Sequence, residues 1–388
     1  MLKYGLSLIC FVFLVSCSGE DKSVYNEGVK LQKVSFASLI DWKRDKINDG
    51  FDKALKDVCL VIDKKNSAFL GDGAIKIPLK EYKKHCSNIL KITKNSELKK
   101  YIYKNFEPYK VIYNNSDEGK FTSYYEADVR VSYNKDEKYK YPIYGKPDDL
   151  IEINLQELDS SLPNKRLVGR VENGKIVKYY TRKEIEENSI RAPVILWGDS
   201  LVDIHIMQIQ GAAVGELPDG KKIRIGYADN NGHKFRGIGS ILLEKKALES
   251  GKYSMDNIRD WLRENEEEAK ESMQLNDRFI FHKIVEADGP IGAMGLPLVA
   301  GRSLAVDKDI IPLGVMVWLE TKTPSGENLN KLVMAQDIGG AIKGAIRGDY
   351  FWGSGGDDVL EQAGKMNSQG QYYILIPNHV EMTNGKKN

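Results

Sequence analysis

The chain has 388 residues, of which 41% are hydrophobic and 29% are charged. Its 57 lysines and arginines nearly balance its 55 aspartates and glutamates, which leaves a formal net charge of only +2. A charge this small, with the lysines scattered along the chain, argues against a nucleic-acid-binding protein. The length is sufficient for two domains with ordinary hydrophobic cores.

The first 17 residues predict export. Lys3 precedes an apolar run, Leu6 to Val15, which is typical of a secretory signal and short for a transmembrane helix. The run ends in Leu14-Val-Ser-Cys17, which resembles the lipobox of bacterial lipoproteins. We therefore expect a signal peptide over residues 1–16, lipidation of Cys17 and a polar tether over residues 17–45. An ordinary signal peptide is the alternative.

Two further features bear on localisation. Ser18 follows the predicted lipidation site, whereas an aspartate there tends to retain lipoproteins of enteric bacteria in the inner membrane. We therefore expect a lipid anchor at the periplasmic face of the outer membrane. In that oxidising compartment Cys59 and Cys86 are expected to form a disulfide. Two buried free thiols are the alternative, because each cysteine lies at helical spacing among apolar residues.

The chain changes from helical to β character near Pro108. From about Trp42 to Phe106 the apolar residues follow a helical period, as in Leu98, Ile102 and Phe106. Residues 127–282 contain mainly short strand candidates, several of them joined by hairpin signals such as Glu172-Asn-Gly174. We also predict a strand over Ile204 to Gln210.

The last hundred residues return to strands punctuated by glycine-rich turns. The predicted strands are Arg302 to Val306, Val315 to Leu319, Lys331 to Ala335 and Tyr372 to Ile376. Many short strands with glycine-rich turns favour β-barrels over a doubly wound α/β sheet.

The chemistry is predicted to lie in the loop that follows Asp337. Seven glycines lie between positions 339 and 356, and Asp349 precedes the aromatic run Tyr350-Phe-Trp352. Glycines let a ligand approach the backbone, and aromatic faces stack on sugar rings. An apolar wall also raises the pKa of a carboxyl, as a general acid requires. The alternative is a turn aspartate bonded to its own backbone, beside core aromatics.

Three blocks resemble the membrane-bound lytic murein transglycosylase A family. They are residues 289–307, Ile310-Ile-Pro-Leu-Gly314 and residues 337–352, and shorter matches extend the resemblance from about 107 to 377. The C-terminal part is similar to the "three-aspartate" (3D) domain, whose namesakes here are Asp307, Asp337 and Asp349.

The resemblance implies a mainly β fold with helices at its N-terminal side. A double-psi β-barrel catalytic domain is expected from residues 46–126 and 283–388, with the three-aspartate region at about 283–380. Residues 127–282 are expected to form an inserted, β-barrel-like glycan-binding domain, with the glycan strand in the groove between the two.

The resemblance also implies an enzyme, a lytic transglycosylase (a carbon–oxygen lyase) acting in cell-wall turnover and remodelling. It cuts the MurNAc-β-1,4-GlcNAc bond of peptidoglycan without water and leaves 1,6-anhydroMurNAc ends. Asp349 takes the catalytic position, with Asp337 and Asp307 as supports. The implied substrate-binding positions are Thr122, Tyr124, Gln210, Gly340, Ala341, Lys343 and Trp352. No cofactor or metal is implied, and cell-wall synthesis or divisome proteins are possible but unidentified partners.

Three alternatives remain open. The first is a hydrolase of the same fold, with Asp349 as acid and Asp337 as the base that activates water. The second is a non-catalytic peptidoglycan-binding module. The third, a metal site made by the three aspartates, is disfavoured because the five histidines are dispersed without ligand spacing.

Overall fold

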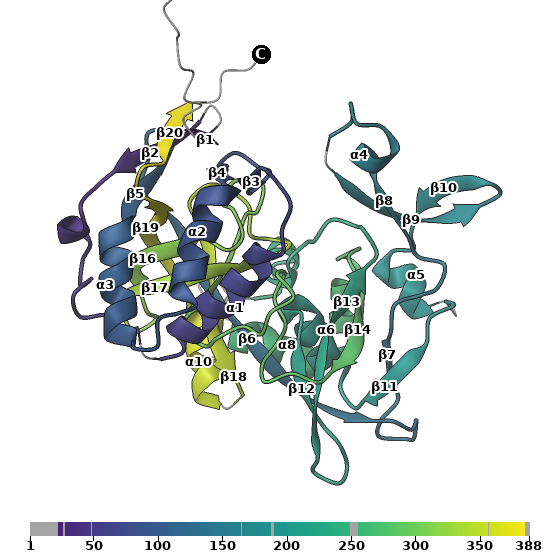
Figure 1. The fold of residues 1–388 in the computed structure, drawn as a ribbon. Coiled ribbons are helices and arrows are strands. Elements are labelled where there is room, and N and C mark those ends of the chain that lie inside the picture. Colours follow the sequence, from purple (N-terminus) through teal and green to yellow (C-terminus); the bar gives the residue numbers. More distant parts are fainter. Residues whose placement is uncertain are drawn as a thin grey trace, which may run out of the picture.

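The computed structural model describes residues 22–25, 28–47, 49–163, 165–187, 190–248, 255–355 and 357–384. The predicted signal peptide and Cys17 lie outside these residues. Within them the chain is mainly β, as predicted, with one large mixed sheet of 13 strands and ten α-helices (Figure 1). No helix in this part of the chain is both long enough and apolar enough to cross a membrane.

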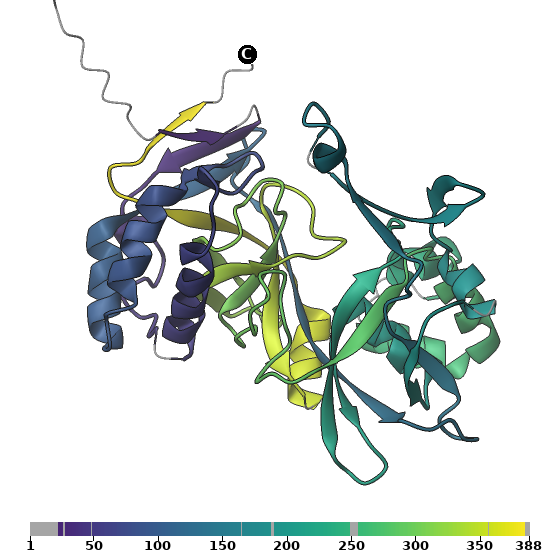
Figure 2. The same cartoon turned by 45° about the vertical axis from the view of Figure 1, so that its right-hand side comes forward.

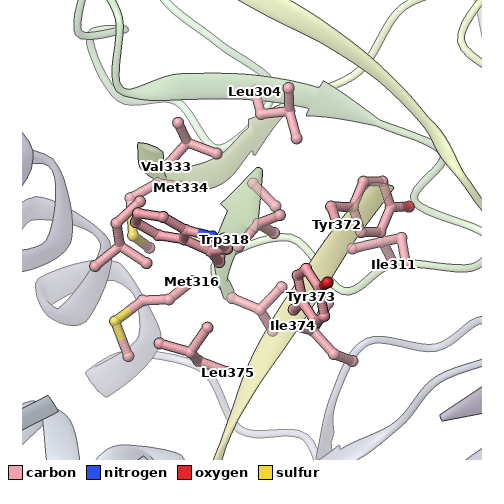
Figure 3. Close-up of a cluster of buried hydrophobic side chains, with 14 of the residues drawn as sticks. Leu304, Ile311, Met316, Trp318, Val333, Met334, Tyr372, Tyr373, Ile374 and Leu375 are labelled. Carbon is pink, nitrogen blue, oxygen red and sulfur yellow. The ribbon is translucent and has the colours of Figure 1, made fainter. Parts of the chain in front are cut away.

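Six strands close into a ring, also called the barrel below, that forms the first unit of the fold. Each pairs with the next, and the last pairs back to the first, in the order β6 (Gly119–Ser132), β18 (Arg347–Ser354), β15 (Ser303–Val306), β17 (Asn328–Asp337), β16 (Met316–Lys322) and β19 (Asn367–Pro377). Side chains such as Trp318, Leu304 and Tyr372 fill its core and are fully buried (Figure 3). The ring therefore joins segments that lie far apart in the sequence.

The predicted helical region packs against this ring (Figure 1). It contains α1 (Phe51–Asp63), β3 (Phe69–Leu70), β4 (Ile77–Pro78), α2 (Leu79–Ile89) and α3 (Asn95–Asn105). The buried faces of α1 and α2 belong to the same hydrophobic cluster as the barrel. Cys59 on α1 and Cys86 on α2 are joined by a disulfide, with their Cα atoms 5.0 Å apart.

The tether prediction is wrong for the segment from Val29 to Asp45. Here β2 (Val29–Lys33) pairs with β5 (Phe106–Tyr113), and η1 (Phe36–Ser38) follows. Trp42 is buried with its ring 5.1 Å from that of Trp318. The buried residues of this segment are few and lie in a short strand and in turns, so the sequence carries no pattern long enough to reveal them. Further out, β1 (Lys22–Tyr25) pairs with β20 (Glu381–Asn384).

Strand β6 continues out of the ring into a second unit with its own hydrophobic cluster. The second half of β6 pairs with β12 (Ala213–Glu216), β12 pairs with β13 (Lys222–Asn230), and β13 pairs with β14 (Ile280–Val285). The end of β6 pairs with β11 (Val194–Gly198), which in turn pairs with β7 (Tyr141–Tyr144). The helices of this part are α5 (Arg182–Glu187), α6 (Leu201–Gln210), α7 (Ile238–Glu244), α8 (Met255–Glu264) and α9 (Glu266–Gln274). Helix α10 (Asp357–Lys365) packs against β6 and β18. One strand thus belongs to both units.

The strand predicted over Ile204 to Gln210 is instead the second half of helix α6. The Ser200 hydroxyl caps this helix by accepting from the Asp203 N–H at 3.2 Å, and Gly211 ends it with φ 90°. Its residues 204–208 are all buried. A short apolar run buried on every side carries no helical period, so the sequence pattern could not distinguish helix from strand.

A small three-stranded sheet projects from the second unit (Figures 1 and 2). We call it the arm; it contains β8 (Ile151–Asn154), α4 (Leu155–Leu158), β9 (Arg166–Glu172) and β10 (Lys175–Lys178). Asp229 of β13 holds its base through ion pairs with Arg166 at 2.5 Å and Lys146 at 2.8 Å. The same two cations bind Glu152 of the arm at 2.8 and 2.5 Å.

Candidate active site

Strand register places the two central aspartates at one level of the barrel. Ala305 of β15 pairs with Asp337 of β17 on one side and with Asp349 of β18 on the other. Thr122 of β6 pairs with Asp349 in turn. Paired residues on neighbouring strands project to the same face, and two strand spacings amount to about 10 Å. The two carboxyls therefore share a face, with only the small side chain of Ala305 between them.

The expectation that Asp349 lies in a glycine-rich loop is wrong, because it lies within strand β18. The glycine before it serves packing rather than a turn. A Cβ at Gly348 would lie 2.9 Å from the ring of Phe121 and 3.0 Å from the side chain of Leu304. The Gly-Asp pair therefore reflects the close approach of three strands in the barrel core.

Asp349 is held at one carboxylate oxygen. Thr122 Oγ1 donates a hydrogen bond to its Oδ1, and Arg347 Nη2 donates to Thr122 Oγ1 at 2.8 Å. Because a guanidinium can only donate, the hydroxyl proton of Thr122 must point to Asp349. No donor among the described residues reaches Oδ2. Burial raises the pKa of Asp349, and the Thr122 hydrogen bond and the Arg347 charge only partly oppose this.

Asp337 is bonded at both carboxylate oxygens. Tyr124 Oη donates to Oδ2 at 2.8 Å, and the Ala293 N–H donates to Oδ1 at 2.9 Å. Burial nevertheless raises the pKa of Asp337 to about 6, and the charge of Asp349 adds to this effect. The pKa of Tyr124 is also raised, by burial and by both carboxylates. The ionisation states of these three groups are therefore linked.

Asp307 lies apart from this pair and holds the loop between β17 and β18. It is buried, binds Lys343 Nζ at 3.1 Å and accepts from the Gly344 N–H at 2.9 Å. Among the described residues no three His, Cys, Asp or Glu side chains gather in a way that could hold a metal ion. The geometry therefore gives no support to a metal site made by the three aspartates.

A cleft of about 1730 Å³ lies between the barrel and the second unit, and residues of both line it. Of the residues predicted from the sequence, Asp337, Tyr124, Gln210, Gly340 and Lys343 line this cleft. Asp349, Thr122, Asp307, Ala341 and Trp352 are not among the lining residues. Gln210 also accepts from the Tyr125 N–H at 3.2 Å, which ties the end of α6 to β6.

Strand alternation relates Asp349 and Thr122 to the cleft. Residues two apart on a strand project to the same face. Asp349 therefore shares a face with Phe351, and Thr122 shares one with Tyr124; both aromatic residues line the cleft, with their rings 5.2 Å apart. Trp352 lies on the other face of β18. Its ring is 5.4 Å from that of Tyr350, and it packs against the hydrophobic clusters of both units.

Sequence reasoning missed three groups that matter for the geometry. Arg347 fixes the Thr122 hydroxyl, while Phe235 and Arg278 of the second unit line the cleft beside Gly340. Arg347 could have been noticed two residues before the predicted catalytic aspartate. The sequence around Phe235 and Arg278 contains no motif that marks them as site residues, because only the folding of the second unit brings them to the barrel.

Comparison with known proteins identifies relatives over most of the chain. The family model of the MltA specific insert domain matches residues 120–283, and the 3D domain model matches residues 302–376. Membrane-bound lytic murein transglycosylase A of Escherichia coli (strain K12) is 30% identical over 265 residues. That match covers 66% of this chain and 65% of the relative, slightly less than two thirds of the relative's length.

Two solved structures are similar over nearly their whole length. MltA from Neisseria gonorrhoeae is 30% identical, with a TM-score of 0.76, and the match covers 92% of this chain and 95% of that chain. A membrane-bound lytic murein transglycosylase from Agrobacterium tumefaciens is also 30% identical, with a TM-score of 0.78 and coverage of 90% and 98%. The chain therefore belongs to the membrane-bound lytic murein transglycosylase A family, as the sequence motifs predicted.

Proposed function

We propose that the protein is a lytic transglycosylase that cuts the MurNAc-β-1,4-GlcNAc bonds of peptidoglycan in cell-wall turnover and remodelling. The observation that carries the proposal is the state of Asp349. Its pKa is raised by burial, Thr122 binds one of its oxygens, and no donor in the described part of the chain reaches the other. Asp349 also shares a face with Phe351, which lines the cleft. Relatives named as murein transglycosylases supply the substrate class.

In the first step, neutral Asp349 donates its proton to the oxygen that bridges the two sugars. The bond from that oxygen to C1 of the muramoyl residue breaks as an oxocarbenium-like state forms. The raised pKa favours the protonated carboxyl that this step requires. Because Thr122 already donates to Oδ1, the transferable proton resides on Oδ2.

In the second step, the Asp349 carboxylate takes the proton from the C6 hydroxyl of the same muramoyl residue. The C6 oxygen attacks C1, which leaves a 1,6-anhydroMurNAc end and returns Asp349 to its neutral form. No water enters the reaction. Since the nucleophile belongs to the bound sugar, proximity replaces the second catalytic carboxyl of an ordinary glycosidase.

The other predicted residues are assigned supporting roles. Asp337 and Tyr124 form a polar wall beside Asp349, and Asp307 holds Lys343 and the loop that contains Gly340. Gln210, Gly340 and the backbone of Ala341 are proposed to line the sugar subsites, together with Lys343. Trp352 is assigned a packing role here, because it lies on the opposite face of β18.

We propose that the six-stranded ring is a double-psi β-barrel, built from residues 46–126 and 283–388. Its closed order of pairings, with parallel β6–β18 and β15–β17 pairs, supports this assignment. Residues 127–282 are proposed as the inserted glycan-binding domain. We also propose that Cys17 carries the lipid anchor and that the enzyme acts at the periplasmic face of the outer membrane; the relatives named "membrane-bound" support an anchor.

One observation favours a second candidate, an inverting hydrolase. The backbones of Asp337 and Asp349 lie two strand spacings apart, about 10 Å, which is compatible with the roughly 6.5–9.5 Å that separates the carboxyls of inverting glycosidases. Asp337 would then be the base that activates water. Its two oxygens, however, already accept hydrogen bonds from Tyr124 and Ala293.

Digestion of purified murein sacculi, followed by mass spectrometry of the released fragments, tests the proposal. The wild-type chain is expected to release soluble anhydro-muropeptides, which are lighter by one water than the products of hydrolysis. Asp349→Asn, which keeps the shape and the Thr122 hydrogen bond, is expected to lower turnover by at least roughly 10²-fold with the fold intact. The exposed Asp219→Asn is the matched control and is expected to retain full activity.

Each contrary result has a definite meaning. Full turnover by Asp349→Asn would remove that residue from the mechanism. Hydrated products from the wild-type chain would establish the hydrolase. Binding of sacculi without release of any fragment would establish a non-catalytic peptidoglycan-binding module.

A further inference from the structure

Arg278 is a partly buried cation in the cleft, and no described carboxylate forms an ion pair with it. It lies two residues before β14, and its Nη1 donates to the carbonyl oxygen of His233 at 3.2 Å. Of the carboxylates that the structure describes, none is ion-paired with its guanidinium; Asp277, next to it in the chain, is exposed. Burial lowers the pKa of Arg278, which reflects the cost of keeping its charge out of water.

The charges around Arg278 do not compensate it. Asp229, which is 2% exposed and acts on Arg278 electrostatically, is already bound by Arg166 at one oxygen and Lys146 at the other. Glu152 binds the same two cations. Two acids thus neutralise two bases. The hydroxyl of Tyr227, the other neighbouring group, accepts from Asn230 at 2.6 Å. Among the described residues, the positive charge of Arg278 is therefore not neutralised by a carboxylate.

The position of this charge relates it to the proposed active site. A Cβ at Gly340 would lie 3.8 Å from Nε and 3.9 Å from Cζ of Arg278, so the guanidinium packs on that glycine. Gly340 is three residues beyond Asp337 and lines the same cleft. Lys234 and Lys283 also line the cleft and are exposed, and neither forms an ion pair with a described residue. A glycan in the cleft would therefore meet a positive surface at this point.

We propose that Arg278 binds a carboxylate carried by the muramoyl residues of the glycan and so selects peptidoglycan over uncharged glycans. The inference rests on the proposed function. N-acetylglucosamine has no carboxylate, whereas N-acetylmuramic acid carries a lactyl group that ends either in a free carboxylate or in a stem peptide with carboxylates of its own. The planar fork of a guanidinium suits either of these ligands. Binding would also remove the uncompensated charge from the cleft.

Binding measurements on the non-cleaving Asp349→Asn chain test the proposal. The probes are three glycans: a hexasaccharide of alternating GlcNAc and MurNAc with free lactyl carboxylates, the same glycan with stem tetrapeptides, and chitohexaose. Arg278→Gln is expected to weaken binding of a carboxylate-bearing glycan about tenfold while leaving chitohexaose unchanged. Arg278→Lys is expected to lie between, since it keeps the charge and loses the fork.

The two carboxylate-bearing probes distinguish the sources of the ligand. A loss confined to the denuded glycan assigns the lactyl carboxylate, and a loss confined to the peptide-bearing glycan assigns the stem. Arg191→Gln, at an exposed arginine that does not line the cleft, is the matched control and is expected to change none of the affinities.

Two outcomes overturn the inference while leaving the proposed function intact. One is unchanged affinity of Arg278→Gln for both carboxylate-bearing glycans. The other is an equal loss for chitohexaose, because that loss would reflect packing on Gly340 rather than charge. If the Asp349→Asn parent binds none of the three glycans, the proposed function fails together with the inference.

Discussion

Asp337 and Asp349 lie two strands apart on one face of the barrel, and they differ in the hydrogen bonds that their carboxylates accept. Asp337 accepts at both oxygens, whereas Asp349 accepts only at Oδ1 from Thr122 among the described residues. The sequence identified both carboxyls. It could not assign the partners, because Tyr124 and Ala293 approach Asp337 from strands and turns far away in the chain.

The electrostatic linkage between the two carboxyls predicts that the pKa of Asp337 changes when Asp349 is replaced. The charge of Asp349 helps to raise the pKa of Asp337 to about 6, so Asp349→Asn is expected to lower the pKa of Asp337. Titration of the Asp337 carboxyl carbon by NMR measures this directly. Asp219→Asn, in a distant hairpin, should leave the value at about 6. An unchanged pKa in Asp349→Asn would show that the two side chains do not face each other.

Arg347 is predicted to act as a positioning residue through Thr122. In Arg347→Gln the Thr122 hydroxyl loses the donor that directs it, so kcat is expected to fall about fivefold, the value of one hydrogen bond of about 1 kcal/mol. The charge of Arg347 also lowers the pKa of Asp349. Removing that charge raises the pKa of Asp349, so this carboxyl stays protonated to higher pH. The alkaline limb of the pH profile of kcat is therefore expected to move to higher pH. A pH profile of kcat that does not shift in Arg347→Gln would assign Arg347 a purely structural role.

At the scale of elements, the strands of the ring are predicted correctly from the sequence, whereas one buried helix and the glycines around Asp349 are not. The predicted strands near residues 303–306, 316–322, 328–337 and 367–377 are all present in the ring. The run over Ile204 to Gln210 was assigned the wrong structure because burial on all sides hides its period. The glycines around Asp349 predict a loop, but Gly348 lies in strand β18, where close strand packing requires a glycine.

The segment before α1 yields a stability prediction. Asp45 is buried and binds Arg302 through both oxygens, at 2.6 and 2.9 Å, and Arg302 is fully buried. Asp45→Ala leaves that guanidinium with Asp49, whose side chain is 48% exposed. We expect a loss of about 3 kcal/mol in the free energy of unfolding, measured by urea denaturation. Asp63→Ala, at an exposed position, should change it by less than about 0.5 kcal/mol. Equal effects of the two changes would contradict this role of the ion pair.

At the scale of the whole molecule, β6 connects the two units and the cleft opens between them. Its first half pairs with β18 of the ring, and its second half pairs with β12 of the second unit. The strand that carries Asp349 and the second unit are thus positioned by the same backbone. The arm is different, since its own sheet is separate from the large one and its base is held by the ion pairs of Asp229.

This arrangement predicts that Asp229 controls the mobility of the arm. In Asp229→Asn, Arg166 and Lys146 keep only Glu152 as a partner, so the arm is expected to open more often. Amide hydrogen exchange over residues 151–178 should become several-fold faster, while exchange in β16 stays unchanged. Uniform acceleration in both places would indicate general destabilisation. Unchanged exchange in the arm would show that the ion pairs do not hold it.

The sequence by itself determined the family, the mainly β class, the helical region before Pro108 and the aspartates of the candidate site. These follow from local periodicity and from motifs that lie within short stretches of chain. The tertiary structure alone decided the closure of the ring, the packing of the segment from Val29 to Asp45, the partners of each carboxyl and the place of Arg278 beside Gly340. These depend on contacts between residues far apart in the chain, and the physical terms that decide them, burial and charge compensation, exist only after the chain has folded.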